Sequence, residues 1–363
     1  MEFTNGFTKS DTKIMKGIAI CLMLWFHLFA CPERAAGDMF VSLLSFENIN
    51  LAEYLGSFGE ISAALLALLF GYECYERSKE APDINALVKC SLSELISAFW
   101  TVFLVCFPVL AYMRRAMRSL LIHETVYNFL GLSTTFNEDW WFVLPFAVML
   151  ILFPIIKRFL NRARSSLYID LLVLVVLNTI IVYVIPVIIT FPAFETLAES
   201  IFWTITQRVL NILPAYIIGC VFARYDILSE IKEKLGNSIL WRIAAVLGIC
   251  AVFLVHFCNY KYYDFVNAGL LTVFTAVLLP TKPMILLGEV FEKLGEESTY
   301  MWLVHSFFCY YWLPKLTYML KYSPLILLWL LLLSFVSAKF IRLIRKYFGE
   351  LCDKLAQRNG AAA

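Results

Sequence analysis

The sequence has little charge for its length. Of its 363 residues, 16 % are Asp, Glu, Lys or Arg, whereas 61 % are hydrophobic. A soluble domain of this size needs more polar side chains to cover its surface. The formal net charge is only +2, so it gives no indication of a polyanionic partner such as nucleic acid. Low charge and a mean hydropathy of +0.75 predict a protein solvated mainly by the lipid bilayer.

Several sequence features of soluble and metal-binding proteins are also missing. The chain has ten cysteines, but most lie in apolar runs, and none forms a CxxC pair or a Cys/His group with zinc spacing. No Gly-rich phosphate loop occurs, and no polar stretch is long enough for a soluble domain of about 50 residues. We therefore expect no disulfide framework and no metal, and we expect residues 1–363 to form one transmembrane domain.

Long apolar runs recur along the whole chain, at a length of about 17 to 25 residues that crosses a hydrocarbon core. They are continuous and Leu-rich, which indicates helices, because barrel strands alternate apolar with polar residues. The fold class predicted is an all-α polytopic membrane bundle of about ten transmembrane helices. Their expected ranges are 14–31, 51–72, 88–112, 140–157, 167–190, 200–223, 239–258, 263–280, 297–314 and 323–344.

Basic residues are distributed unequally between the predicted loops. Most of the 30 Lys and Arg residues fall in the tails and in alternate loops that share one side of the membrane. By the positive-inside rule that side is the cytoplasm. Both termini, with tails at 1–13 and 346–363, are therefore expected to be cytoplasmic.

The first apolar run contains an ionisable pair. Lys16 and His27 are eleven residues apart in "KGIAICLMLWFH", which places them about 20° apart around an α-helix. Ionisable side chains inside a membrane are costly and need a partner, a water-filled cavity or a function. A basic group at the inner end and an imidazole in the outer half of one helix face suit a passage for an anionic molecule. A snorkelling lysine and a structural histidine are the alternative.

The second run returns inward and places Glu60 at a depth similar to that of His27. If the two side chains meet, the carboxylate would hold one imidazole tautomer and leave the other nitrogen free as a base. Alternatively, Glu60 faces an outer vestibule.

Five segments together are similar to a known family. Their order and spacing extend over nearly the whole chain, and the chain resembles a member of acyltransferase family 3, the integral membrane acyltransferases that modify cell-surface glycans and some small molecules. The first segment carries a basic residue, ten intervening residues and a histidine, which Lys16 and His27 match. The segments are "IMKGIAICLMLWFHLF", "LFGYECYERSK", "DWWFVLPFAVMLILFP", "RVLNILPAYIIGCVFAR" and "GEESTYMWLVHSF".

The chain departs from the family pattern in three places. Phe70 replaces the usual serine before Gly71, and Thr299 and Trp302 stand where tyrosines are frequent. The family's third helix usually begins with several arginines, but the corresponding segment "NALVKCSLSELISAFW" has only Lys89. If those arginines hold the nucleotide part of the donor, this chain must use Lys89, Arg77 and Lys79, or bind the donor differently.

The resemblance implies transfer of an acyl group, most often acetyl, from cytoplasmic acyl-coenzyme A to a hydroxyl of a cell-surface or exported glycan. It implies His27 as catalytic base or transient acyl carrier, with Lys16 binding the donor phosphate. The expected location is the bacterial plasma membrane. The glycan hydroxyl must lose a proton as it attacks, and an imidazole is suited to take it.

Other residues are expected to bind the acceptor, each with a structural alternative. His305 matches the family's late histidine, and Arg208 lies inside an apolar run, where it needs an anionic partner. Trp141 suits stacking on a sugar ring, although interfacial tryptophans also anchor helices. Arg115 and Arg118, three residues apart, suit a basic patch for anionic sugar groups or for lipid headgroups.

Two further functions fit the same composition. Buried charges in a ten-helix bundle also suit a transporter or flippase of a polar or lipid-linked substrate. A non-catalytic sensor or scaffold is the third interpretation, and it predicts that acyl-coenzyme A does not bind. The sequence does not indicate the acceptor, the acyl chain length or the oligomeric state.

Overall fold

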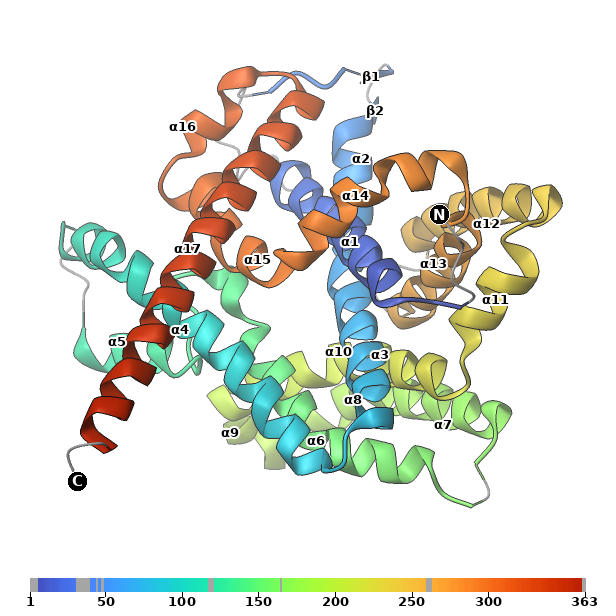
Figure 1. The fold of residues 1–363 in the computed structure, drawn as a ribbon, viewed down its shortest axis with the longest axis horizontal. Helices are drawn as coiled ribbons and strands as arrows, with labels where there is room; N and C mark the ends of the chain where they lie inside the picture. Colours follow the sequence, from blue (N-terminus) through green and yellow to red (C-terminus); the bar gives the residue numbers. More distant parts are fainter. Residues whose placement is uncertain are drawn as a thin grey trace.

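The computed structural model describes residues 6–30, 40–43, 45–46, 49–116, 121–163, 165–258 and 263–360. These residues form a bundle of helices with one two-stranded antiparallel ribbon, β1 (Ser45–Phe46) and β2 (Ile49–Asn50), at one edge (Figure 1). The long helices are α1 (Lys9–Phe29), α3 (Ser62–Glu80), α4 (Ile84–Ala116), α6 (Val143–Leu160), α7 (Leu167–Thr179), α10 (Ile201–Arg224), α12 (Ile239–Cys258), α13 (Asp264–Leu278), α14 (Lys282–Glu296) and α17 (Ser323–Gly360).

Shorter helical segments connect these elements. They are α2 (Leu51–Phe58), η2 (Gly59–Ile61), α5 (Ile122–Phe129), η3 (Glu138–Trp140), η4 (Ile180–Val184), α8 (Ile185–Ile189), η5 (Pro192–Phe194), α9 (Glu195–Ala198), α11 (Ile227–Leu235), α15 (Ser298–Ser306), η6 (Phe307–Tyr311), α16 (Pro314–Thr317) and η7 (Tyr318–Leu320). Of these, η4 and η6 are π-helices.

The polytopic helical bundle predicted from the sequence is confirmed. Eight helical spans among the described residues are long and apolar enough to cross a membrane, and a bent pair would make nine. The outward faces of α7 and α12 are apolar and exposed, as at Leu172 and Leu247, which suits contact with lipid tails.

The sequence predicts ten spans, and the difference arises at two chain breaks. The chain bends by 118° between α13 and α14. Pro280 lies at this bend, where it cannot continue the helix of α13. The run predicted at 297–314 is divided into the nine-residue α15, the π-helix η6 and a break before Pro314. Neither segment is a single straight crossing.

Two close helix crossings form the centre of the bundle. Helices α3 and α10 approach where a Cβ on Gly71 would overlap the backbone of Tyr216, and one on Gly219 would overlap that of Leu68. Small residues at such crossings let helix backbones come together in membranes. Helices α1 and α14 cross in the same way, with Gly17 against the backbone of Phe291.

Helix α1 is fixed at its start by a capping box. The Thr8 side chain accepts from the Asp11 backbone N–H, and the Asp11 carboxylate accepts from that of Thr8. These bonds satisfy backbone donors that would otherwise lack partners. At its other end α1 reaches α2, α15 and η6, and this end carries His27.

Candidate functional site

His27 lies two residues before the end of α1 and contacts Tyr310 of η6. The imidazole Nδ1 is 2.9 Å from the Tyr310 hydroxyl, and that hydroxyl donates a short hydrogen bond to the His27 backbone carbonyl. A hydroxyl has one proton. Since the carbonyl receives it, the Tyr310 oxygen accepts from the Nδ1–H of His27. In the neutral imidazole, Nε2 then carries the lone pair.

Asp139 of η3 lies between His27 and a second imidazole. Its Oδ1 is 3.7 Å from Nδ1 of His27, and its Oδ2 is 3.6 Å from Nε2 of His305. The two imidazole rings are 4.6 Å apart between centroids. The structure therefore brings two predicted site residues, His27 and His305, together around one carboxylate.

His305 is fully buried in α15. Its Nδ1 lies 2.7 Å from the Trp302 carbonyl oxygen, and because a carbonyl only accepts, Nδ1 is the protonated nitrogen. Nε2 of the neutral ring therefore has a lone pair, and it faces Asp139. Neither this Nε2 nor Oδ2 of Asp139 has a hydrogen-bond partner among the described residues.

Hydrogen bonds between η3 and α15 hold Asp139 and His305 in register. The indole N–H of Trp140 donates to the Leu303 carbonyl at 2.9 Å, and that of Trp302 donates to the Asp139 carbonyl at 3.1 Å. Buried indole N–H groups need such acceptors. The position of Trp302, where the family frequently has tyrosine, is thus part of this connection.

One residue pair extends that connection. The side-chain amide of Asn137 donates to the Ser306 hydroxyl at 2.7 Å, and both residues are buried. Hydrogen bonds therefore join the chain before η3 to the end of α15.

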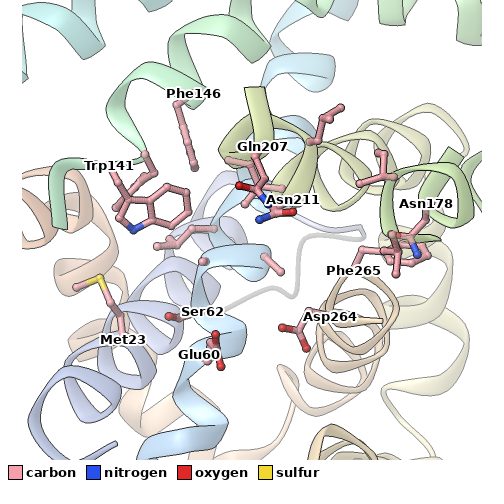
Figure 2. A pocket seen from close by; sticks show the side chains of 18 of the residues that line it. Met23, Glu60, Ser62, Trp141, Phe146, Asn178, Gln207, Asn211, Asp264 and Phe265 are labelled. Atoms are coloured by element: carbon pink, nitrogen blue, oxygen red, sulfur yellow. The ribbon is translucent and has the colours of Figure 1, made fainter. Parts of the chain in front are cut away.

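A cavity of about 580 Å³ opens beside His27 and Asp139. Figure 2 shows carboxyl groups of Glu60 and Asp264 on one side of it and amides of Gln207 and Asn211 on another. Its remaining wall is mostly apolar and includes η4, α8 and the Trp141 ring. An apolar cavity with a few convergent polar groups is the usual form of a small-molecule site.

Glu60 lines this cavity, as does His27. Asp139 also supplies a carboxylate at an ion-pair distance from His27. The role expected for Glu60 in orienting the imidazole stays a prediction. Trp141 also lines the cavity, where its ring is available to a bound acceptor.

A second hollow adjoins the first, because His27, Asp139 and Trp141 line both. Arg208 of α10 and Glu138 of η3 lie in the second hollow, so Arg208 is near the reacting groups despite its place in an apolar helix. Arg115 lies in the last turn of α4 with an undescribed side chain, and Arg118 falls outside the described residues.

The cations predicted to bind the donor lie on α1, α3 and α4. Lys16 pairs with the Glu73 carboxylate of α3, and Arg77 lies 3.6 Å from that of Glu94 on α4. Lys89 is exposed. A phosphate-bearing donor would therefore compete with the ion pairs that Lys16 and Arg77 already form.

Sequence reasoning missed Asp139 and Tyr310 as site residues. A signal for Asp139 was present, since a carboxylate directly before a Trp-Trp helix start is costly in the membrane unless it is used. No comparable signal marked Tyr310. One nitrogen of each imidazole and an oxygen of Asp139 lie within 4.8 Å of one another, which is close enough to hold one metal ion.

No curated protein matches the chain, and no solved structure does. A family model, described as an acyltransferase domain, matches residues 11–341, which include every element that builds the site. The chain therefore belongs to acyltransferase family 3, and it is a membrane acyltransferase.

Proposed function

We propose that the protein transfers an acetyl group from cytoplasmic acyl-coenzyme A to a hydroxyl of a cell-surface or exported glycan. The observation that carries this proposal is the state of His27. Its Nδ1–H is held by Tyr310, and its ring lines the cavity that also holds the polar groups of Glu60, Gln207 and Asn211. An imidazole whose other nitrogen is unprotonated is suited to take a proton from an acceptor hydroxyl.

The proposed reaction moves one proton and one acyl group. As Nε2 of His27 takes the hydroxyl proton, the hydroxyl oxygen attacks the thioester carbonyl, and the carbon–sulfur bond breaks. The imidazolium then returns its proton to the departing thiolate, so that the products are an ester and the free thiol. Asp139, 3.7 Å from the same ring, stabilises the imidazolium formed during this exchange.

The cavity supports a sugar hydroxyl as the acceptor. Glu60, Asp264, Gln207 and Asn211 supply both hydrogen-bond acceptors and donors along its walls. The Trp141 ring, which lines the cavity, offers an apolar surface on which a pyranose can stack. In the adjoining hollow, Arg208 provides a cation for an anionic sugar substituent.

The donor is proposed to reach His27 along α1 from the end that carries Lys16. Both residues lie on this one helix, so the coenzyme phosphates can bind near its start while the thioester lies near its end. Phosphate binding requires Lys16 to exchange its carboxylate partner, Glu73, for the ligand. Arg77 and Lys89 are the further cations available on α3 and α4.

The test is transfer of radiolabelled acetyl from acetyl-coenzyme A in membranes supplied with native surface glycans. Wild type is compared with His27→Ala at equal expression. Loss of a general base lowers rates by about 10²- to 10⁴-fold, so label should appear on glycan with the wild type and be nearly absent with the variant. His123→Ala removes an exposed imidazole and should leave the rate unchanged.

A second variant separates acyl transfer from transport. If the protein is a transporter that needs only bulk and hydrogen bonding at this position, His27→Asn should keep the substrate flux of the wild type. Equal labelling with wild type and His27→Ala would remove His27 from the mechanism. Absence of label in every membrane, with folding verified and a broad acceptor mixture, would contradict the proposed reaction.

A further inference from the structure

Two buried lone pairs face each other at the centre of the site. Nε2 of His305 and Oδ2 of Asp139 are 3.6 Å apart, and each lacks a hydrogen-bond partner among the described residues. Because Nδ1 of His305 carries that ring's proton, neither atom can donate to the other while Asp139 is ionised. Burying such atoms without a partner is costly. A cation between them would satisfy both.

The geometry and the donor types match a metal site. His27 supplies a third ligand, since one atom from each of His27, Asp139 and His305 lies within 4.8 Å of the others. Bonds of about 2.0–2.1 Å in a tetrahedron place neighbouring ligands about 3.4 Å apart. Nε2 of His305 lies 3.6 Å from Oδ2 of Asp139, and Nδ1 of His27 lies 3.7 Å from Oδ1 of the same carboxylate, so each imidazole lies near its own carboxylate oxygen. Two imidazoles and one carboxylate form a set that zinc uses with its fourth position open.

The groups around the three residues are those of a prepared site. Metal-binding histidines usually donate their second ring N–H to a carbonyl or carboxylate, and His305 does so to the Trp302 carbonyl. Trp302 also donates to the backbone of Asp139. Both His27 and Asp139 line the cavity, so the open position has access to it. Imidazole ligands favour zinc and similar transition metals over magnesium or calcium.

We propose that His27, Asp139 and His305 bind one divalent transition-metal ion such as Zn²⁺, and that metal binding blocks acyl transfer. The second part rests on the proposed function, in which His27 is the base. Coordination through Nε2 would occupy the lone pair that takes the proton. Coordination through Nδ1 would leave the ring proton on Nε2. Either mode removes the base, so the metal and the acceptor proton compete for His27.

Metal binding is tested on purified full-length protein in detergent, independently of acyl transfer. Metal-free protein is titrated with Co²⁺, followed by visible absorption, and Zn²⁺ is then used to displace it. We expect one ion per chain. Loss of one ligand in Asp139→Asn or His305→Gln should weaken binding by at least about tenfold. The chain has four histidines, and His123→Gln and His256→Gln are the matched controls that should bind normally.

Inhibition is measured in the labelling assay. Zn²⁺ should suppress wild-type transfer over the concentration range in which it displaces Co²⁺, and a chelator should restore it. No bound metal in the wild type, or equal binding by both ligand variants, would overturn the site. Binding without inhibition would overturn the competition. If Asp139→Asn misfolds, His305→Gln decides the result, and if no transfer is seen, the proposed function fails while the Co²⁺ titration still tests the site.

Discussion

Replacing Tyr310 with phenylalanine should impair the reaction without removing His27. The hydroxyl accepts from Nδ1–H of His27 at 2.9 Å and donates to the carbonyl of the same residue. Its loss leaves a partly buried donor and acceptor without these partners, at a cost of about 1–3 kcal/mol. If the tautomer with an unprotonated Nε2 becomes less stable by that free energy, the reactive form of His27 is populated less. The value of kcat then decreases about 5- to 160-fold, because 1.36 kcal/mol corresponds to a factor of ten.

The control is Tyr318→Phe. The Tyr318 hydroxyl donates to the Leu28 carbonyl at 2.9 Å, one residue beyond His27 on α1, so it holds the same helix end. The described contacts place it on the backbone and not on the imidazole. Both variants should lose a similar amount of thermal stability, but only Tyr310→Phe should lose most of its kcat.

The assay is the rate of labelled acetyl transfer under saturating donor and acceptor, with unfolding followed on the same preparations. Equal losses of kcat in Tyr310→Phe and Tyr318→Phe would show that both hydroxyls act by anchoring α1. An unchanged rate in Tyr310→Phe would refute the assignment of the tautomer.

Three further predictions concern packing and recognition. Gly17→Ala should lower the thermal midpoint by the equivalent of about 1–3 kcal/mol, since the new Cβ would overlap the Phe291 backbone of α14. The control is Gly288→Ala on α14, where the new Cβ meets its nearest atom at 3.4 Å, and this variant should be neutral or stabilising in a melting comparison. Glu297→Gln should lower the free energy of unfolding by about 1–3 kcal/mol, because the buried carboxylate loses its charge-assisted contacts with Lys339 and Arg342, whose own side chains are about half exposed; a normal melting curve would contradict this. Asn211→Leu should raise KM for the glycan more than it lowers kcat, because the amide lines the cavity from α10 whereas the reacting ring is on α1, and steady-state kinetics would detect the opposite pattern.

The helical bundle could be predicted from the sequence because a helix that crosses the membrane needs a continuous apolar run of about 20 residues. The sequence did not predict α14, which follows the bend at Pro280 and crosses α1. This helix has Glu289, Glu292 and Glu296 on it, so it does not resemble a spanning segment, and two of these carboxylates pair with Lys13 of α1. A search for continuous apolar runs omits such a helix.

Within the site, residues on regular helices were easier to predict than those placed by irregular backbone. His27 and His305 carried both a motif and the cost of burial. Tyr310 follows His305 by five residues, which an α-helix would turn about 140° away. The π-turn η6 begins between them, and its i→i+5 bonding brings residues five apart closer to one face. Such a change of register has no sequence rule that would have revealed it.

Different parts of the chain hold Asp139 and His305 and supply the polar groups on the other cavity walls. Asp139 and His305 are held by hydrogen bonds between α15 and the segment 137–140, whereas the polar groups on the other walls come from η2, α3, α7, α10 and α13. Substitutions of the polar side chains on those elements should leave Asp139, His305 and their hydrogen bonds in place. The acceptor preference of this chain could thus be re-engineered through the side chains of one set of elements, while the carboxylate and the second imidazole beside His27 keep their positions.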